Sequence, residues 1–284
     1  MPVTPFADRF ETLATARSPL CVGLDPAPET LKAWDLPYSA EGVRVFGLEM
    51  VEALGDRIAI YKPQVAFYER FGWKGLKALE EVVRHIRSTG ALALADIKRM
   101  DIGHTLEAYA AAWLGEDAGT PVDAITLGAY MGSGSLKPVV DRAVQAGAGL
   151  FVVVRSSNPD GIVLQNARQE DDRTVAEALA DDLTLFNRGQ LSKLNGAGPV
   201  GAVVGATLDD AEGVLDRLRT SLILAPGIGA QGATMADVKS RFGRDAARRT
   251  LPTVSRQIAH AGPNRAAIRE TTERLREEAF ALRG

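Results

Sequence analysis

Eight short apolar runs, separated by stretches in which apolar residues recur with helical spacing, are the feature that most restricts the fold of this chain. The runs lie at residues 20–24, 58–62, 91–96, 124–127, 150–154, 200–204, 222–226 and 251–255. Runs that are apolar on both faces are typical of parallel strands covered on both sides. Helical spacing is clearest at residues 40–54, 76–88, 105–115, 135–147, 175–188, 208–220, 234–243 and 264–282.

This alternation predicts parallel βαβ units, and eight strands predict a closed α/β barrel, the (β/α)8 or TIM barrel, rather than an open sheet. The length of 284 residues would also fit two ordinary domains, but no linker or low-complexity tract divides the chain. We therefore expect a single domain over residues 1–284. The long connections at 156–199 and 227–250, after strands 5 and 7, are expected to be binding loops or lids. The first should contain a helix of its own, and the alternative is a poorly ordered insertion.

Composition excludes several classes of protein. A formal net charge of −3 provides no basic field for extended nucleic-acid binding. No stretch approaches the roughly 20 apolar residues of a membrane span. The single cysteine, Cys21, lies in an apolar run and is expected to be a buried thiol. We expect a cytoplasmic protein with neither nucleic acid nor membrane as partner.

Polar side chains gather where the predicted strands end, which in such barrels is the end that carries the active site. Asp96 and Lys98 end the third run and are two residues apart, so they should share the side of the strand that faces the barrel mouth. An isolated pair of this kind is usually a solvated ion pair. Here polar residues also follow the first, second and fifth runs, and glycine-rich or basic segments follow the seventh and eighth, where barrels commonly bind phosphate. The pattern indicates a site for a phosphorylated ligand.

The segment "ADIKRMDIGHT" at residues 95–105 resembles the Asp-x-Lys-x-x-Asp motif of the orotidine 5'-phosphate decarboxylase family. The resemblance covers nearly the whole chain, through the segments "CVGLDP", "YKPQVAFYE", "RSSNP", "APGIGAQG" and "SRQI". The sequence is similar to the larger bacterial branch of that family. It implies a carboxy-lyase that converts orotidine 5'-phosphate to uridine 5'-phosphate and CO2, the last step of de novo UMP synthesis. It also implies a (β/α)8 fold and a reaction without cofactor or metal.

The resemblance implies roles for a charged array made of Lys62, Asp96, Lys98 and Asp101. Loss of CO2 from the pyrimidine C6 leaves a carbanion in the ring plane, which the ring carbonyls cannot delocalise, so a fixed cation must stabilise it. Lys98 is expected to stabilise and then protonate this carbanion. Asp96 is expected to lie beside the departing carboxylate.

The remaining site residues follow from the same resemblance. The implied substrate contacts are Asp25 and Lys62 for the ribose, Ser157 for the pyrimidine, and Gly229, Gln231, Ser255 and Arg256 for the phosphate. A homodimer is also implied, in which Asp101, Ile102 and Thr105 reach the neighbouring subunit's site. The end of strand 8 departs from the pattern of the family's shorter members, because Ser255 replaces a glycine before Arg256. Whether the backbone next to Arg256 contacts the phosphate therefore stays open.

Two other functions stay open at this point. One is a metal-dependent decarboxylase or aldolase of the same barrel group, which would use the charged array with a divalent ion to stabilise an enediolate. Such a site needs further carboxylates at strand ends, whereas the second run ends in Lys62. The other is a non-catalytic sensor of a phosphoribosyl ligand, which would not require the whole charged array.

Overall fold

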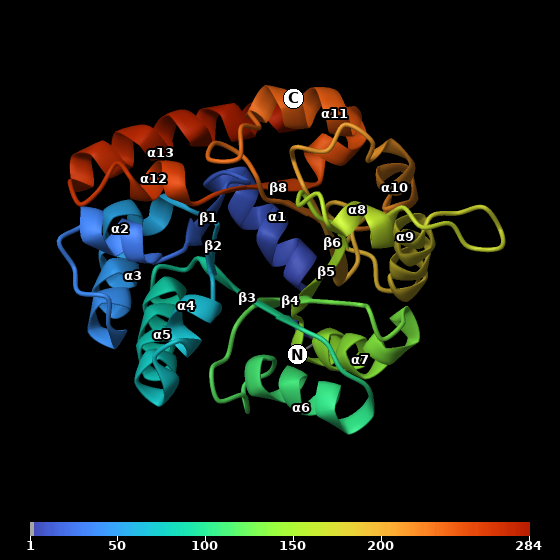
Figure 1. The fold of residues 1–284 in the computed structure, drawn as a ribbon, viewed down its shortest axis with the longest axis horizontal. Coiled ribbons are helices and arrows are strands. Elements are labelled where there is room, and N and C mark those ends of the chain that lie inside the picture. The colour runs from blue at the N-terminus through green and yellow to red at the C-terminus, as the bar shows by residue number, and fades with distance from the viewer. Residues whose placement is uncertain (1–2) are drawn as a thin grey trace.

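Eight parallel strands, one for each predicted run, close into a barrel in the order β1 to β8 in the computed structural model, which describes residues 3–284 (Figure 1). β8 pairs with β1 through Thr253 and Cys21, which closes the ring. The (β/α)8 barrel expected from the sequence is confirmed. The strands are β1 (Cys21–Leu24), β2 (Ile60–Pro63), β3 (Leu92–Arg99), β4 (Ala124–Leu127), β5 (Gly149–Arg155), β6 (Val200–Val204), β7 (Ile223–Ala225) and β8 (Thr250–Val254).

Helices surround the barrel, and each predicted helical segment overlaps one of them. Their apolar faces pack on the outward faces of the strands in one large buried cluster, to which Phe46, Leu79 and Val152 contribute. Short additional helices lie between the main ones. The helices outside the barrel are α2 (Pro28–Ala33), α3 (Ala40–Leu54), α4 (Ala66–Glu69), α5 (Gly72–Ser88), α6 (Gly103–Trp113), α7 (Lys137–Ala146), α8 (Gly161–Gln165), α9 (Val175–Phe186), α10 (Glu212–Arg217), α11 (Met235–Arg248), α12 (Arg256–Ala259) and α13 (Arg265–Phe280), with 3-10 turns η1 (Gly55–Arg57), η2 (Ser133–Leu136) and η3 (Ala281–Arg283).

The N-terminal helix α1 (Phe6–Ala16) lies apart from the outer ring and was not expected from the sequence. Figure 1 shows it in blue in the middle of the ring that the other helices form. Phe6 and Phe10 pack against inward-facing strand residues such as Ile60, Leu94 and Phe151. Because these contacts fill the N-terminal end of the barrel, the opposite end is the one that can accept a ligand.

The inward-facing side chains change from apolar to polar along the barrel axis. Alternate residues of a strand face the same side. Ile60 on β2 and Leu94 on β3 therefore belong to the apolar cluster under the barrel, and two residues further on Lys62 and Asp96 are buried among polar groups. The strands thus place charged side chains at the C-terminal mouth, on top of an apolar floor.

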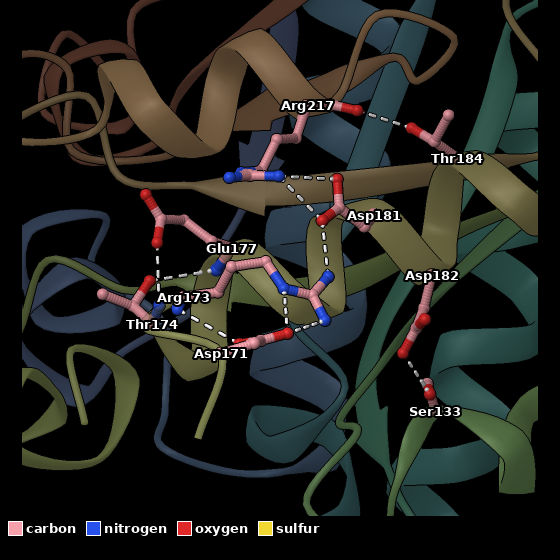
Figure 2. Close-up of polar contacts among 9 residues, drawn as sticks. All are labelled: Ser133, Asp171, Arg173, Thr174, Glu177, Asp181, Asp182, Thr184 and Arg217. Carbon is pink, nitrogen blue, oxygen red and sulfur yellow. Dashed lines mark hydrogen bonds and ion pairs between the residues drawn. The ribbon is translucent and has the colours of Figure 1, made fainter. Parts of the chain in front are cut away.

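The long connection between β5 and β6 is ordered and tied to its neighbours. Figure 2 shows Asp181 of α9 between Arg173 and Arg217, which donate to its Oδ2 at 2.7 and 2.8 Å. The next residue, Asp182, accepts a hydrogen bond from Ser133 of η2 at 2.6 Å. These partly exposed pairs contribute about 0.2–1 kcal/mol each. Together they fix α9 against both adjacent parts of the barrel, so the alternative of a poorly ordered insertion does not apply.

The connection after β7 is mostly helix. α11 occupies Met235–Arg248, and Thr234 caps it by accepting from the Asp237 N–H while Asp237 accepts from the Thr234 N–H. The connection expected at 227–250 therefore contains the helix predicted at 234–243, and its loop is confined to residues 226–234. Across residues 3–284 no helix has the length and apolar character needed to cross a membrane.

Candidate active site

Asp96 is the centre of the polar cluster at the barrel mouth. It is only 6% exposed. Its Oδ1 accepts from Lys98 Nζ at 2.6 Å and from Thr126 Oγ1 at 2.8 Å, and its Oδ2 accepts from Lys62 Nζ at 2.9 Å and from Gln64 Nε2 at 3.0 Å. Four donors on two oxygens fix both the position and the orientation of this carboxylate.

The charges of Asp96 and Lys62 are maintained despite their burial. Burial alone would raise the pKa of Asp96, but Lys62 and Lys98 outweigh it and hold that pKa well below its usual range. Burial alone would likewise lower the pKa of Lys62, but Asp96 and Asp25 outweigh it and raise that pKa above its usual value. The site is therefore a preformed ionic cluster at neutral pH.

Lys98 reaches Asp96 through an irregular backbone rather than through simple strand alternation. Its φ of 43° is left-handed, and the pairing register of β3 with β4 shifts between Ala95 and Arg99. Its side chain is 51% exposed. The predicted meeting of the two side chains is found, but the alternation argument alone does not account for it, because the strand is irregular at Lys98.

Asp25 lies at the end of β1, next to Lys62. Its Oδ1 is 3.9 Å from Lys62 Nζ and is buried with no hydrogen-bond partner within residues 3–284. A buried acceptor without a donor costs about 1–3 kcal/mol. A hydroxyl of a ligand would satisfy it, which is the chemistry expected for a ribose contact.

The loops after β5 and β7 meet above the strand ends. Ser157 Oγ donates to Gln231 Oε1 at 2.9 Å. Gln231 lies in a tight turn that is closed by a bond from the Gly229 N–H to the Ala233 carbonyl at 2.8 Å. Gly229 has a φ of 77°, a conformation that glycine adopts without strain. The structure thus joins Ser157 and Gln231, two residues that the sequence reasoning assigned to different parts of the ligand.

Ser255 and Arg256 follow β8 at the same end of the barrel. Arg256 is exposed and begins the short helix α12. Ser255 packs directly over Gly23 of β1, where an added Cβ would lie 1.8 Å from Ser255 Oγ. The serine that departs from the short-form pattern is therefore accommodated by a glycine on the neighbouring strand.

Asp101, Ile102 and Thr105 lie outside the ionic cluster. Asp101 Oδ1 accepts from the Ile102 N–H at 2.8 Å. In the part of the chain that the structure describes, Asp101 makes no ion pair with Lys62, Asp96 or Lys98. Ile102 is 61% exposed and Thr105 is exposed as well. The structure therefore does not bring the fourth member of the predicted array together with the other three within one chain.

Two kinds of supporting contact were not predicted from the sequence. Thr126 and Gln64 donate to Asp96. The threonine lies within an apolar run and carries no recognisable signal, whereas Gln64 is one of the polar residues that follow the second run, to which no contact with Asp96 was assigned. Arg155 ends β5 as expected but is only 1% exposed, and its Nη2 donates to both oxygens of Asp210 at 2.6 and 2.7 Å. Arg155 is thus a buried guanidinium paired with the exposed carboxylate of Asp210, rather than a free cation at the mouth.

Cys21 lies below the cluster. It is fully buried, as expected, and burial raises its pKa to about 12. The thiol therefore stays protonated and is not a nucleophile. No group of three or more His, Cys, Asp or Glu side chains within residues 3–284 is arranged to hold a metal ion.

Comparison with known proteins agrees with this geometry. The profile of the orotidine 5'-phosphate decarboxylase / HUMPS family matches residues 18–271. The chain is 49% identical to orotidine 5'-phosphate decarboxylase of Myxococcus xanthus, with 98% of this chain and 96% of that protein covered. It is 43% identical to the enzyme of the same name from Salinispora tropica, with 95% of each chain covered.

Solved structures give the same result. A crystal structure described as a putative orotidine 5'-phosphate decarboxylase from Streptomyces avermitilis superimposes with a TM-score of 0.93 at 43% identity, covering 100% of this chain and 97% of that one. OMP decarboxylase of Leishmania donovani gives a TM-score of 0.80 at 33% identity, with 99% of each chain covered. Both the profile match and the full-length identities place this sequence within one group, and the chain belongs to the orotidine 5'-phosphate decarboxylase / HUMPS family.

Proposed function

We propose that this chain decarboxylates orotidine 5'-phosphate to uridine 5'-phosphate and CO2 without a cofactor. The observation that carries the proposal is the ionic cluster of Lys62, Asp96 and Lys98 at the mouth of the barrel, in a chain whose near full-length relatives bear the name of that enzyme. The last step of UMP synthesis is the corresponding place in metabolism.

The cluster suits the chemistry because its charges are fixed before the substrate binds. An ionised Asp96 placed near the substrate carboxylate would repel it, and two unit charges about 4 Å apart interact by roughly 4 kcal/mol at an effective dielectric of about 20. Loss of CO2 removes this repulsion and leaves Lys98 facing the new carbanion at C6. The interaction with Lys98 is then stronger in the transition state than with the bound substrate, as catalysis requires. Lys98 next donates a proton to C6, which completes uridine 5'-phosphate.

The proposed substrate contacts follow the positions of the site residues. Asp25 and Lys62 bind the ribose hydroxyls, and the unpartnered Asp25 oxygen supports this role. Ser157 binds the pyrimidine. Arg256 binds the phosphate as a guanidinium donor, with the Gly229–Gln231 turn closing over it and Ser255 adjacent. Phosphate binding remote from the reacting carbon would then hold the site closed to water.

We also propose that the chain acts as a homodimer, in which Asp101, Ile102 and Thr105 of each subunit complete the partner's site. Large apolar side chains exposed around these residues support the interface, which would bury them. They are Met100, Ile102, Tyr109, Tyr130 and Met131. Residues 1–284 would form one domain, and the buried free thiol of Cys21 is compatible with a cytoplasmic location.

The test is a continuous absorbance assay of orotidine 5'-phosphate turnover by the purified chain, with and without EDTA. We expect stoichiometric formation of uridine 5'-phosphate at a rate that EDTA does not change. Activity lost on chelation and restored by a divalent ion would favour the metal-dependent barrel enzyme. Tight binding of uridine 5'-phosphate without turnover would favour the non-catalytic sensor.

A further inference from the structure

Thr126 of β4 contacts both members of the Asp96–Lys98 pair, although the mechanism above gives it no role. It is 0% exposed. Its Oγ1 donates to Asp96 Oδ1 at 2.8 Å and accepts from the Lys98 backbone N–H at 2.9 Å. A hydroxyl has one proton to donate and lone pairs to accept, so one side chain satisfies both neighbours at once.

The bond to the Lys98 N–H lies at the point where β3 becomes irregular. Here the register with β4 shifts, and Lys98 adopts a φ of 43°. A non-glycine residue in this conformation is strained by about 1–3 kcal/mol and persists only when its surroundings hold it. The Thr126 hydroxyl is one such restraint. The resulting backbone turn directs the Lys98 side chain back to Asp96, with 2.6 Å between Nζ and Oδ1.

We propose that Thr126 is a positioning residue that fixes the relative placement of Asp96 and Lys98. This inference rests on the proposed decarboxylase function. The Asp96 carboxylate keeps three other donors without Thr126, so its charge does not depend on this hydroxyl. Lys98 depends on it more, because its side chain is half exposed and could otherwise turn toward solvent. Loss of the hydroxyl should therefore affect where the ammonium lies rather than whether the cluster is charged.

Threonine suits this position better than its near relatives. Its branched Cβ restricts χ1, so the hydroxyl has few orientations to choose from. Valine has nearly the same shape but leaves the Lys98 N–H without its acceptor. Serine keeps the hydroxyl and loses only a methyl group. The comparison of Thr126→Val with Thr126→Ser therefore separates the hydrogen bonds from the packing.

The experiment compares the steady-state kinetics of Thr126→Val and Thr126→Ser with those of the wild type. For Thr126→Val we expect kcat to fall about 100-fold, the scale expected when a reacting group is misplaced by about 1 Å. KM and the affinity for uridine 5'-phosphate should change less than about threefold, because the ligand contacts remain. Thr126→Ser should keep most of the wild-type kcat. Thr253→Val is the matched control, since Thr253 is a buried threonine of β8 whose hydroxyl donates to the Leu251 carbonyl instead.

Hydrogen exchange of the Lys98 amide provides a measurement that does not depend on activity. We expect faster exchange in Thr126→Val than in the wild type and no change in Thr253→Val. The proposal is overturned if Thr126→Val keeps kcat within about threefold of the wild type, if Thr126→Ser loses as much as Thr126→Val, or if the Lys98 amide exchanges at the wild-type rate. Should Thr126→Val fail to fold, Thr126→Ala is measured against Thr126→Ser with the same criteria. A wild type that does not decarboxylate orotidine 5'-phosphate refutes the proposed function, while the amide exchange still tests the positioning.

Discussion

Replacement of Asp96 by asparagine tests whether the ionic cluster is as tightly coupled as its geometry implies. The substitution keeps the size of the side chain but removes its charge and replaces one acceptor oxygen with a donor NH2 group. Lys62, which is 4% exposed, is then left with Asp25 at 3.9 Å as its only nearby carboxylate within residues 3–284. At an effective dielectric of about 20, Lys62 with its Nζ 2.9 Å from Asp96 Oδ2 attracts that carboxylate by roughly 6 kcal/mol, most of which offsets desolvation. The half-exposed Lys98 contributes much less, because water screens its charge. We expect Asp96→Asn to lower the free energy of unfolding by about 3–5 kcal/mol at neutral pH, as found when one member of a buried pair is removed.

The pH dependence of this difference follows from the two shifted pKa values. The pKa of Asp96 is lowered by folding, so its contribution is fully present above the unfolded value of about 3.9 and is lost as the pH falls through the lower folded value. The pKa of Lys62 is raised by folding, so its contribution is present below about 10.4 and is lost as the pH rises through the higher folded value. The difference between wild type and Asp96→Asn should therefore be flat from about pH 5 to 9 and shrink on both sides.

The assay is urea unfolding followed by tryptophan fluorescence, at one protein concentration because a dimer would make stability concentration-dependent. Asp216→Asn on α10 is the control, since this exposed carboxylate should change stability by less than about 0.5 kcal/mol. The reasoning is wrong if Asp96→Asn unfolds within about 0.5 kcal/mol of the wild type, or if the difference grows as the pH falls below about 4.

Two further predictions concern contacts at the mouth of the barrel. Gly23→Ala places a Cβ 1.8 Å from Ser255 Oγ, so we expect weaker binding of uridine 5'-phosphate and a lower Tm. The second substitution Ser255→Gly should restore both the affinity, measured by titration calorimetry, and the Tm, measured by thermal unfolding. A double variant no better than Gly23→Ala alone would contradict this. Gln231→Ala removes the partner of Ser157 Oγ at 2.9 Å, so KM for orotidine 5'-phosphate should rise about tenfold with Tm unchanged, and an unaltered KM would show that this contact does not help to hold the substrate.

The barrel was predictable because its strands are buried on both faces. Each apolar run forms a strand that lies close to the expected bounds. The largest difference is at β3, which ends at Arg99 rather than at residue 96. Helix α1 and its position under the barrel were not predicted, because the amphipathic pattern of a single segment does not show which surface that segment covers. Its partners, such as Ile60 and Phe151, come from strands far along the chain and converge only when the barrel closes.

The charged residues of the site were predictable, whereas the groups that orient them were not. Asp96 and Lys98 are recognisable from their place at a strand end, and Lys62 from the run before. Thr126 is not recognisable, because a β-branched residue in an apolar strand is ordinary and its hydrogen bonds depend on the register between β3 and β4. Arg155 is the first of the polar residues that follow the fifth run, and these were expected at the mouth. Its partner Asp210 follows a different strand, so the burial of Arg155 could not be deduced from local sequence.

The central claim is that the Lys98 ammonium, held beside Asp96, stabilises and protonates the carbanion. The most direct test is the single-turnover rate of orotidine 5'-phosphate decarboxylation by Lys98→Ala, measured together with its affinity for uridine 5'-phosphate and its Tm. Loss of a preorganised cation and of the general acid together predicts a rate lower by about 10⁴-fold or more, with ligand affinity and Tm close to those of the wild type. A folded Lys98→Ala protein that decarboxylates within about tenfold of the wild-type rate would contradict the account.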